Sequence, residues 1–276
     1  MSKHKTYNKI FSIYGSGKVF KYSLERGAEG GFDADYQAVL NYATTQGYTL
    51  PSAGQQTLQN QLVVDLKDGG IWSKLDTFAV FATDGDSDFA LIDWKRLSDY
   101  TAVNSPTFTT NQGFKGNDTS SYVDTNYNVT VDSINYTLNN CGFGYYMNLA
   151  NTSSIGTEGA FAAYDANSSN RAWLRYTTKR ISLNTGQIAY INFATASNQL
   201  VSINREVLDI FINEGNTITG TVSIATSGAI PNVNFETHKA GTNYNDSELS
   251  MVWVGGSIQS EINNFNLAWN TYFTSL

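Results

Sequence analysis

Cysteine, proline and histidine are scarce in this sequence, whose 276 residues include one cysteine, three prolines and two histidines. A single cysteine, Cys141, cannot form a disulfide within the chain, so disulfide bonds do not hold the fold together. The first twenty residues lack the apolar core of a signal peptide, and no later run approaches the length that spans a membrane. These absences predict a chain with neither a Sec signal nor a membrane span.

Charge is also sparse, and it is unevenly placed. Charged residues make up 15% of the chain, the net charge is -7 and the sequence pI is about 4.8. Up to Phe32 there are six Lys or Arg and two Glu, which gives +4 and leaves -11 for the rest of the chain. An acidic chain is a poor ligand for a polyanion, so nucleic acid is not an expected partner.

Aromatic residues, by contrast, are abundant, with 17 Tyr, 15 Phe and 5 Trp. Beyond Tyr100, short runs such as "GFGYYMNL", "RAWLRYT" and "EVLDIFIN" alternate with Gly, Asn, Asp and Ser. This pattern is typical of a mainly β, antiparallel sandwich or jelly roll. Four tryptophans are expected in the interior: Trp72, Trp94, Trp253 and Trp269. A closing helix is expected from Ser260 as N-cap, with Ile262, Phe265, Trp269 and Tyr272 on its apolar face.

The segment before the strands has a different pattern. Residues 1–32 mix Lys, Tyr, Gly and Ser without a sustained hydrophobic period, which predicts a basic arm that does not fold alone. Two helices are expected after it, with N-caps and glycine stops at Asp33 and Gly47 and at Ser52 and Gly69.

Three aspartates, Asp84, Asp86 and Asp88, are spaced like the first ligands of an EF-hand loop. Such a loop needs a glycine at its sixth position and a glutamate at its twelfth, but these positions hold Phe89 and Lys95. The residues instead predict the acidic tip of a hairpin between "TFAVFA" and "FALIDW". A calcium site of another kind, built from these carboxylates and backbone carbonyls, stays open as the alternative.

The hydrophobic periodicity changes near residues 32 and 98. These changes divide the chain into an arm (1–32), a small α+β adaptor (33–98) and a jelly-roll domain (99–276). Within the last part, "GFKGNDTSSYVDT", "EVLDIFINEG" and "VWVGGSIQSEINNF" resemble strands of laminin G-like and concanavalin A-like jelly rolls. The resemblance implies an antiparallel sandwich that closes with a helix.

The adaptor carries a second resemblance. "YQAVLNYATTQGYTLPS", followed by "LVVDLKDGGIWSKLDTFAVFATDGDSDFALIDWK", is similar to a module of bacteriophage virion structural proteins, often from phages that infect Bacteroidetes. The resemblance implies a fibre, spike or decoration protein, made in the host cytoplasm and held in the virion by other virion proteins through the arm and adaptor. It implies no catalytic residue and no cofactor.

The acidic residues and histidines of the chain do not favour an enzyme. Jelly-roll glycosidases need two carboxylates across the scissile bond, and the glutamates of the body never alternate closely with other acids on one strand. Only His4 and His238 are available for a Ser-His-Asp site; His4 lies in the arm, and a lone loop histidine such as His238 is expected at the surface. We therefore expect no enzyme, with a jelly-roll glycoside hydrolase kept as an alternative.

Binding has a candidate in "RAWLRYT". Strand alternation places Arg171, Trp173 and Arg175 on one face and leaves the other face to the core. An indole between two guanidinium groups suits stacking on a sugar ring and pairing with an acidic substituent. The alternative is that a neighbouring strand, loop or subunit covers Trp173.

The sequence as a whole therefore predicts a non-enzymatic virion component that contributes to the recognition of host-surface glycan. A purely structural capsid or tail decoration protein is the alternative. Because aromatic β surfaces with little charge are self-complementary, a homo-oligomer is expected, with a trimer as the first guess.

Overall fold

The computed structural model describes residues 31–149, 159–164, 170–175, 180–185, 189–190, 197–224 and 228–276. The chain separates into two compact units, Met1–Phe32 and Asp33–Leu276, and almost all described residues belong to the second. Within these ranges, no helix combines the length and the apolar character needed to cross a membrane.

The three long helices lie where the sequence predicts them. Helix α1 (Ala34–Gln46) follows Asp33, whose carboxylate accepts a hydrogen bond from the Asp35 N–H, and it ends at Gly47 with φ +82°. Helix α2 (Ala53–Asp68) begins after Ser52 and ends at Gly69. Helix α5 (Ile262–Phe273) has its N-cap at Glu261, so the prediction of Ser260 is wrong by one residue, because the turn η2 (Gln259–Glu261) precedes the helix. The remaining helical segments are short: η1 (Trp72–Lys74), α3 (Ser87–Ala90) and α4 (Val129–Asp132).

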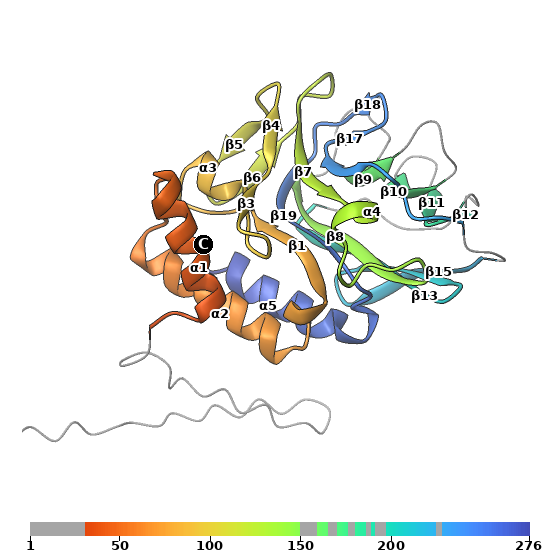
Figure 1. The fold of residues 1–276 in the computed structure, drawn as a ribbon, viewed down its shortest axis with the longest axis horizontal. Helices are drawn as coiled ribbons and strands as arrows, with labels where there is room; N and C mark the ends of the chain where they lie inside the picture. Colours follow the sequence, from red (N-terminus) through yellow and green to blue (C-terminus); the bar gives the residue numbers. More distant parts are fainter. Residues whose placement is uncertain are drawn as a thin grey trace, which may run out of the picture. The chain divides into compact units, whose positions relative to one another are not determined.

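Two antiparallel sheets make up most of the described fold, as the sequence predicts (Figure 1). The first sheet has the order β15-β14-β13-β8-β19-β6-β5, and β1 also pairs with β19. Its strands are β1 (Leu75–Val80), β5 (Thr107–Thr109), β6 (Gly113–Lys115), β8 (Asn140–Leu149), β13 (Gln199–Glu206), β14 (Asp209–Glu214), β15 (Thr217–Ser223) and β19 (Glu248–Gly255).

The second sheet has the order β12-β11-β10-β9-β16-β7-β4. Its strands are β4 (Thr101–Val103), β7 (Tyr122–Asn128), β9 (Phe161–Tyr164), β10 (Arg171–Arg175), β11 (Arg180–Leu183), β12 (Ala189–Tyr190) and β16 (Asn234–Thr237). Two small hairpins lie outside these sheets: β2 (Ile92–Asp93) with β3 (Ser98–Asp99), and β17 (Lys239–Ala240) with β18 (Asn243–Tyr244).

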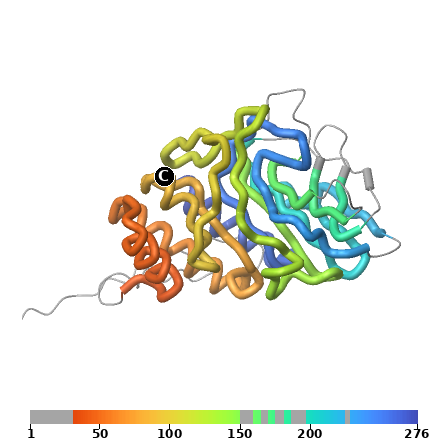
Figure 2. The backbone as a smooth tube through the Cα atoms, turned by 45° about the horizontal axis from the view of Figure 1, so that its top comes forward, coloured from red at the N-terminus to blue at the C-terminus, as the bar shows by residue number. Residues whose placement is uncertain are grey.

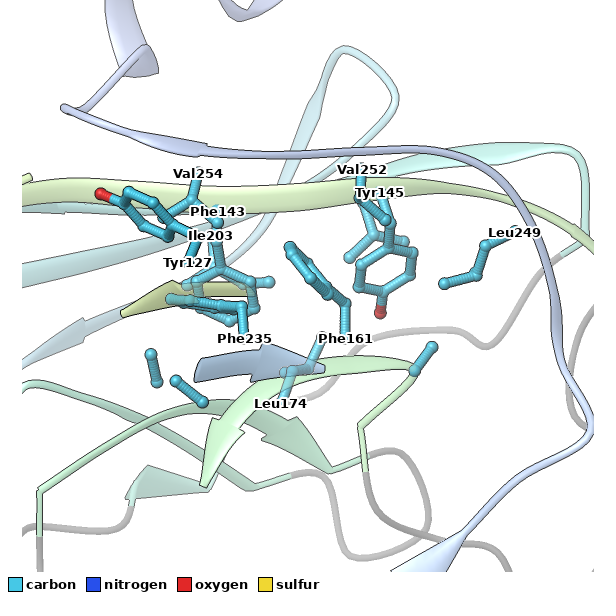
Figure 3. Close-up of a cluster of buried hydrophobic side chains, with 14 of the residues drawn as sticks. Tyr127, Phe143, Tyr145, Phe161, Leu174, Ile203, Phe235, Leu249, Val252 and Val254 are labelled. Carbon is cyan, nitrogen blue, oxygen red and sulfur yellow. The ribbon is translucent and has the colours of Figure 1, made fainter. Parts of the chain in front are cut away.

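Aromatic rings fill the space between the two sheets. Figure 3 shows Phe143 and Ile203 of the first sheet reaching toward Phe161 and Phe235 of the second. The ring centroids of Phe143 and Phe235 are 5.4 Å apart, and those of Phe161 and Phe235 are 5.0 Å apart. Aromatic pairs at these separations stabilise a core beyond the apolar area that they bury.

Helix α5 lies against the other face of the first sheet, α2 packs against α5, and α1 packs against α2 (Figure 1). There Trp253 of β19 packs edge-on against Phe265 of α5, with ring centroids 5.8 Å apart. Gly144 of the neighbouring strand β8 makes room for this indole, because a Cβ at Gly144 would lie 2.4 Å from Trp253 Nε1. The predicted burial of Trp72, Trp94, Trp253 and Trp269 is confirmed.

A buried polar network ties the helices to one another. The Tyr36 hydroxyl of α1 donates to Gln59 Oε1 of α2 at 2.7 Å. The Tyr272 hydroxyl of α5 accepts from Gln59 Nε2 at 3.2 Å and donates to the Ala82 carbonyl just beyond β1. Satisfied buried networks of this kind fix one arrangement of the packed elements.

The predicted hairpin between residues 77 and 94 is wrong. Strand β1 pairs with β19 from Leu75 opposite Gly255 to Val80 opposite Met251, with one irregularity between Leu75 and Thr77, and β2 pairs with β3 instead. Figure 2 shows the chain passing from the N-terminal helices, in red and orange, into the sheets. All six residues of β1 are buried, so this strand needs cover on both faces, which the sheet position beside β19 provides. The helical layer and the sandwich are therefore continuous through β1.

Candidate ligand-binding face

The outer face of the second sheet carries the residues that the sequence singled out. The predicted alternation in β10 is confirmed, since Ala172 and Leu174 lie in the sandwich core and Trp173 points the other way. Trp173 is only 2% exposed, however, and packs against Ala162 of β9 and Ala240 of β17. In this conformation its ring is covered by a neighbouring hairpin, as in the alternative interpretation, and is not a free stacking surface.

Arg171 lies one step further along the same face. Its guanidinium carbon is 4.5 Å from the ring centroid of Tyr164, which in turn packs edge-on against Trp173 with centroids 5.8 Å apart. Both Arg171 and Tyr164 are half-buried. The side chain of Arg175, the third member of the predicted site, lies outside the described residues. The face therefore offers a stacked Tyr164–Arg171 pair rather than an indole between two guanidiniums.

A second aromatic-cation pair lies on the same sheet, and the sequence analysis missed it. Lys239 Nζ lies 4.1 Å from the ring centroid of Tyr122, and the ring of Tyr244 is 6.3 Å from that of Tyr122. These residues come from β7, β17 and β18, which are distant in sequence, so no local pattern predicts their contact. We call Tyr122, Tyr164, Arg171, Lys239 and Tyr244 together the outer aromatic face.

Two carboxylates border this face on neighbouring strands. Glu236 of β16 lies opposite Asp124 of β7 and forms an ion pair with Lys239 at 2.7 Å. Burial raises the pKa of Glu236 despite that ion pair. Burial also acts to lower the pKa of Lys239, but the hydrogen bond and the charge of Glu236 together raise it. Because Glu236 and Asp124 lie on two strands that are distant in sequence, the spacing of acids along one strand does not reveal this pair.

The three aspartates of the "TDGDSDFA" stretch do not form a hairpin tip. Asp86 caps α3 by accepting from the Phe89 N–H at 2.8 Å, and its other oxygen accepts from the Thr49 N–H at 2.7 Å. Asp84 accepts from the Ser52 N–H at 3.0 Å, while Asp88 is exposed. Two of these carboxylates therefore tether the α1–α2 connection. Among the described residues, no group of three or more His, Cys, Asp or Glu side chains is placed to hold a metal ion.

His238 is not a surface residue, contrary to expectation. Its side chain is fully buried, with Nδ1 2.6 Å from Thr237 Oγ1 and Nε2 3.1 Å from the Phe114 carbonyl oxygen. Burial lowers its pKa to about 4. The ring, as a neutral group, therefore links its own segment to β6. His4 lies outside the described residues.

Comparisons with known proteins place the fold among β-sandwiches. No protein-family model and no curated protein matches the sequence. Solved structures do match: Trypanosoma rangeli sialidase in complex with 2,3-difluoro-KDN has a TM-score of 0.52 at 11% identity, over 79% of this chain and 40% of that one. The same sialidase with sialic acid has a TM-score of 0.51 at 11% identity, over 80% and 40%. Domain 4 of AbnA, a GH43 arabinanase from Geobacillus stearothermophilus, has a TM-score of 0.45 at 11% identity, over 70% and 98%.

The chain thus spans about two fifths of the length of the sialidase structures that it matches. At this level of identity the likeness concerns the fold alone. The chain is an antiparallel β-sandwich of the jelly-roll kind, with a helical layer on one sheet.

Proposed function

We propose that this chain is a non-enzymatic structural protein of a bacteriophage particle, of the spike, fibre or decoration type, and that its sandwich helps to recognise glycan on the host surface. The likeness of the adaptor segment to phage virion modules supports the first part. The second part rests on the outer aromatic face.

The outer aromatic face has the chemistry that sugar recognition needs. Tyrosine rings offer flat apolar surfaces to the C–H face of a sugar, and each of the two ring groups has a cation beside it, Arg171 near Tyr164 and Lys239 near Tyr122. Each cation lies over one face of its ring, and a cation beside a stacking ring favours sugars with acidic substituents. The sialidase structures that share the fold include one with sialic acid, an acidic sugar, which is compatible with this ligand class.

A glycan array with the full chain tests the recognition step. Tyr122→Ala is expected to weaken binding by about 1 to 3 kcal/mol, roughly a fivefold to 150-fold loss, because a stacking ring is removed. Tyr42→Ala is the matched control, since Tyr42 is also half-buried but lies on α1, where its hydroxyl donates to Asp99. Equal losses in the two variants, or no binding by the wild-type chain, would refute glycan recognition by this face.

Mass spectrometry of purified particles tests the virion assignment. The chain should be present in particles after density purification, in stoichiometric ratio to other structural proteins. Its recovery only from the lysate would remove the assignment.

The purely structural alternative is favoured by one observation, the burial of Trp173. Under that reading neighbouring subunits cover the outer aromatic face, and the array gives no signal.

We also propose that the chain forms a homo-oligomer, for which a trimer is the first guess. A monomeric mass by light scattering at micromolar concentration would count against it.

A further inference from the structure

We propose that the β17–β18 hairpin is a displaceable cover over Trp173, and that its opening, which moves Lys239 and Tyr244 away from Tyr122, exposes the indole ring and its N–H donor beside Tyr164 and Arg171. This proposal rests on the glycan recognition proposed above and concerns how the ligand face is completed.

The first observation is the indole N–H of Trp173. Trp173 is 2% exposed, yet its Nε1 has no hydrogen-bond partner among the described residues. A buried N–H without an acceptor is unfavourable, and tryptophan usually finds a partner when it is buried. Trp94, Trp253 and Trp269 also lack an acceptor there, but they lie against the α1, α2 and α5 layer. Trp173 instead lies beneath a short hairpin.

The second observation is the small size of this hairpin. Its strands form a separate sheet of two residue pairs, Lys239 with Tyr244 and Ala240 with Asn243. A two-stranded hairpin is only marginally stable by itself. Its contacts with β9 and β10 come from small residues, the Ala240 methyl on Trp173 and Gly241 against the Tyr164 ring. Gly241 has φ +64°, and a Cβ there would lie 2.9 Å from Tyr164 Cδ1.

The third observation is that backbone hydrogen bonds fix both ends of the hairpin, whereas side-chain contacts hold the residues between them. At its base, the His238 N–H donates to the Ala160 carbonyl at 2.7 Å, and the Asn245 N–H donates to the His238 carbonyl at 3.0 Å. Between these ends, Lys239 forms a partly buried ion pair with Glu236 at 2.7 Å, which we call the latch, and Lys239 and Tyr244 contact the ring of Tyr122. Residues 239–244 can swing about positions 238 and 245 when the latch and the contacts with Tyr122 break, while the backbone hydrogen bonds at the ends are kept.

Opening would create a site for a sugar with an acidic substituent. The sugar ring would stack on the indole, an oxygen of the sugar would accept from Nε1–H, and Arg171 on the same strand would pair with the acidic group. The ligand would thus supply the acceptor that the closed state lacks, and its apparent affinity would be reduced by the fraction of molecules that are closed.

Glu236→Gln is the test variant, because it removes the negative charge of the latch and substitutes no residue of the outer aromatic face. Lys74→Met, which removes the ion pair between Lys74 and Glu261 on the helical layer, is the matched control. Acrylamide quenching of tryptophan fluorescence is measured for the full wild-type chain, Glu236→Gln and Lys74→Met, each with and without Trp173→Phe. The difference in quenching between the two members of each pair reports the accessibility of Trp173. We expect Glu236→Gln to raise this difference at least threefold and to tighten glycan binding about threefold to tenfold, and Lys74→Met to change neither.

Hydrogen exchange provides a second measurement that does not depend on Trp173→Phe. The amides of residues 239–244 should exchange at least ten times faster in Glu236→Gln, while those of residues 161–164 stay unchanged. Faster exchange and quenching with no glycan bound by any variant would support the moving cover but refute its role in glycan recognition. Unchanged quenching and exchange in Glu236→Gln, with or without glycan, would overturn the proposal.

Discussion

His238 makes a strong prediction about stability against pH, because it is buried as a neutral ring. In the unfolded chain its pKa is near the ordinary value of 6.5, whereas burial lowers the folded pKa to about 4. Between these two values the unfolded state binds more protons than the folded state, so stability falls as the pH falls from about 6.5 to about 4. A difference of about 2.5 pKa units corresponds to roughly 3 kcal/mol lost by pH 4, of which about 2 kcal/mol is lost by pH 5.

Urea unfolding from pH 7.5 to 4.5 measures this loss, with His238→Asn as the comparison. Asparagine does not titrate there, and it tolerates the left-handed backbone of this position, φ +57°. His238→Asn should lower the free energy of unfolding at pH 7.5, because the Thr237 and Phe114 contacts are lost. The free energy of unfolding of the variant should then fall less steeply toward pH 5 than that of the wild-type chain. Other groups titrate equally in both proteins and cancel in the difference. A wild-type minus variant difference that stays constant across this range would refute a buried neutral His238.

Two further predictions concern stability and are measured by urea unfolding at neutral pH. Asp86→Ala should cost about 1 to 3 kcal/mol, because it leaves two backbone N–H groups without their acceptor, whereas Asp88→Ala should change stability by less than about 0.5 kcal/mol. Equal effects would contradict the tether. Gly144→Ala should cost about 1 to 3 kcal/mol or more, because its Cβ would meet the Trp253 indole, whereas Gly54→Ala in α2 has open space and should be neutral or slightly stabilising. Tolerance of Gly144→Ala would show that the indole does not pack there.

The predictable parts of the fold were the ones encoded by nearby residues. The ends of α1 and α2 follow from side-chain caps and glycine stops, and the inward face of β10 follows from strand alternation. The partner of β1 could not be predicted, because β19 lies about 170 residues further along the chain and many strands have similar apolar patterns. The same limit hid the cover over Trp173, since nothing near "RAWLRYT" indicates that Ala240 packs on it.

Part of the negative charge beyond Phe32 is carried by carboxylates that are buried. Asp76 is buried and accepts hydrogen bonds from the Asn135 and Tyr136 N–H groups and from the Tyr127 hydroxyl. Asp93 is fully buried and accepts from Thr77 Oγ1 and from the Phe78 and Lys95 N–H groups, while burial raises its pKa. Carboxylates of this kind act as internal acceptors for loop amides, and the dipoles around them offset part of their field.

The formal charge of -11 beyond Phe32 therefore overstates the charge that a partner meets at the surface. Attraction between the basic arm of one molecule and the acidic body of another should accordingly depend on exposed carboxylates such as Asp88, and should weaken steeply with added salt. Cation-π stacking on the outer aromatic face rests on short contacts between half-buried groups, so it is screened less. Binding through that face should thus persist at salt concentrations that abolish contacts made by the arm.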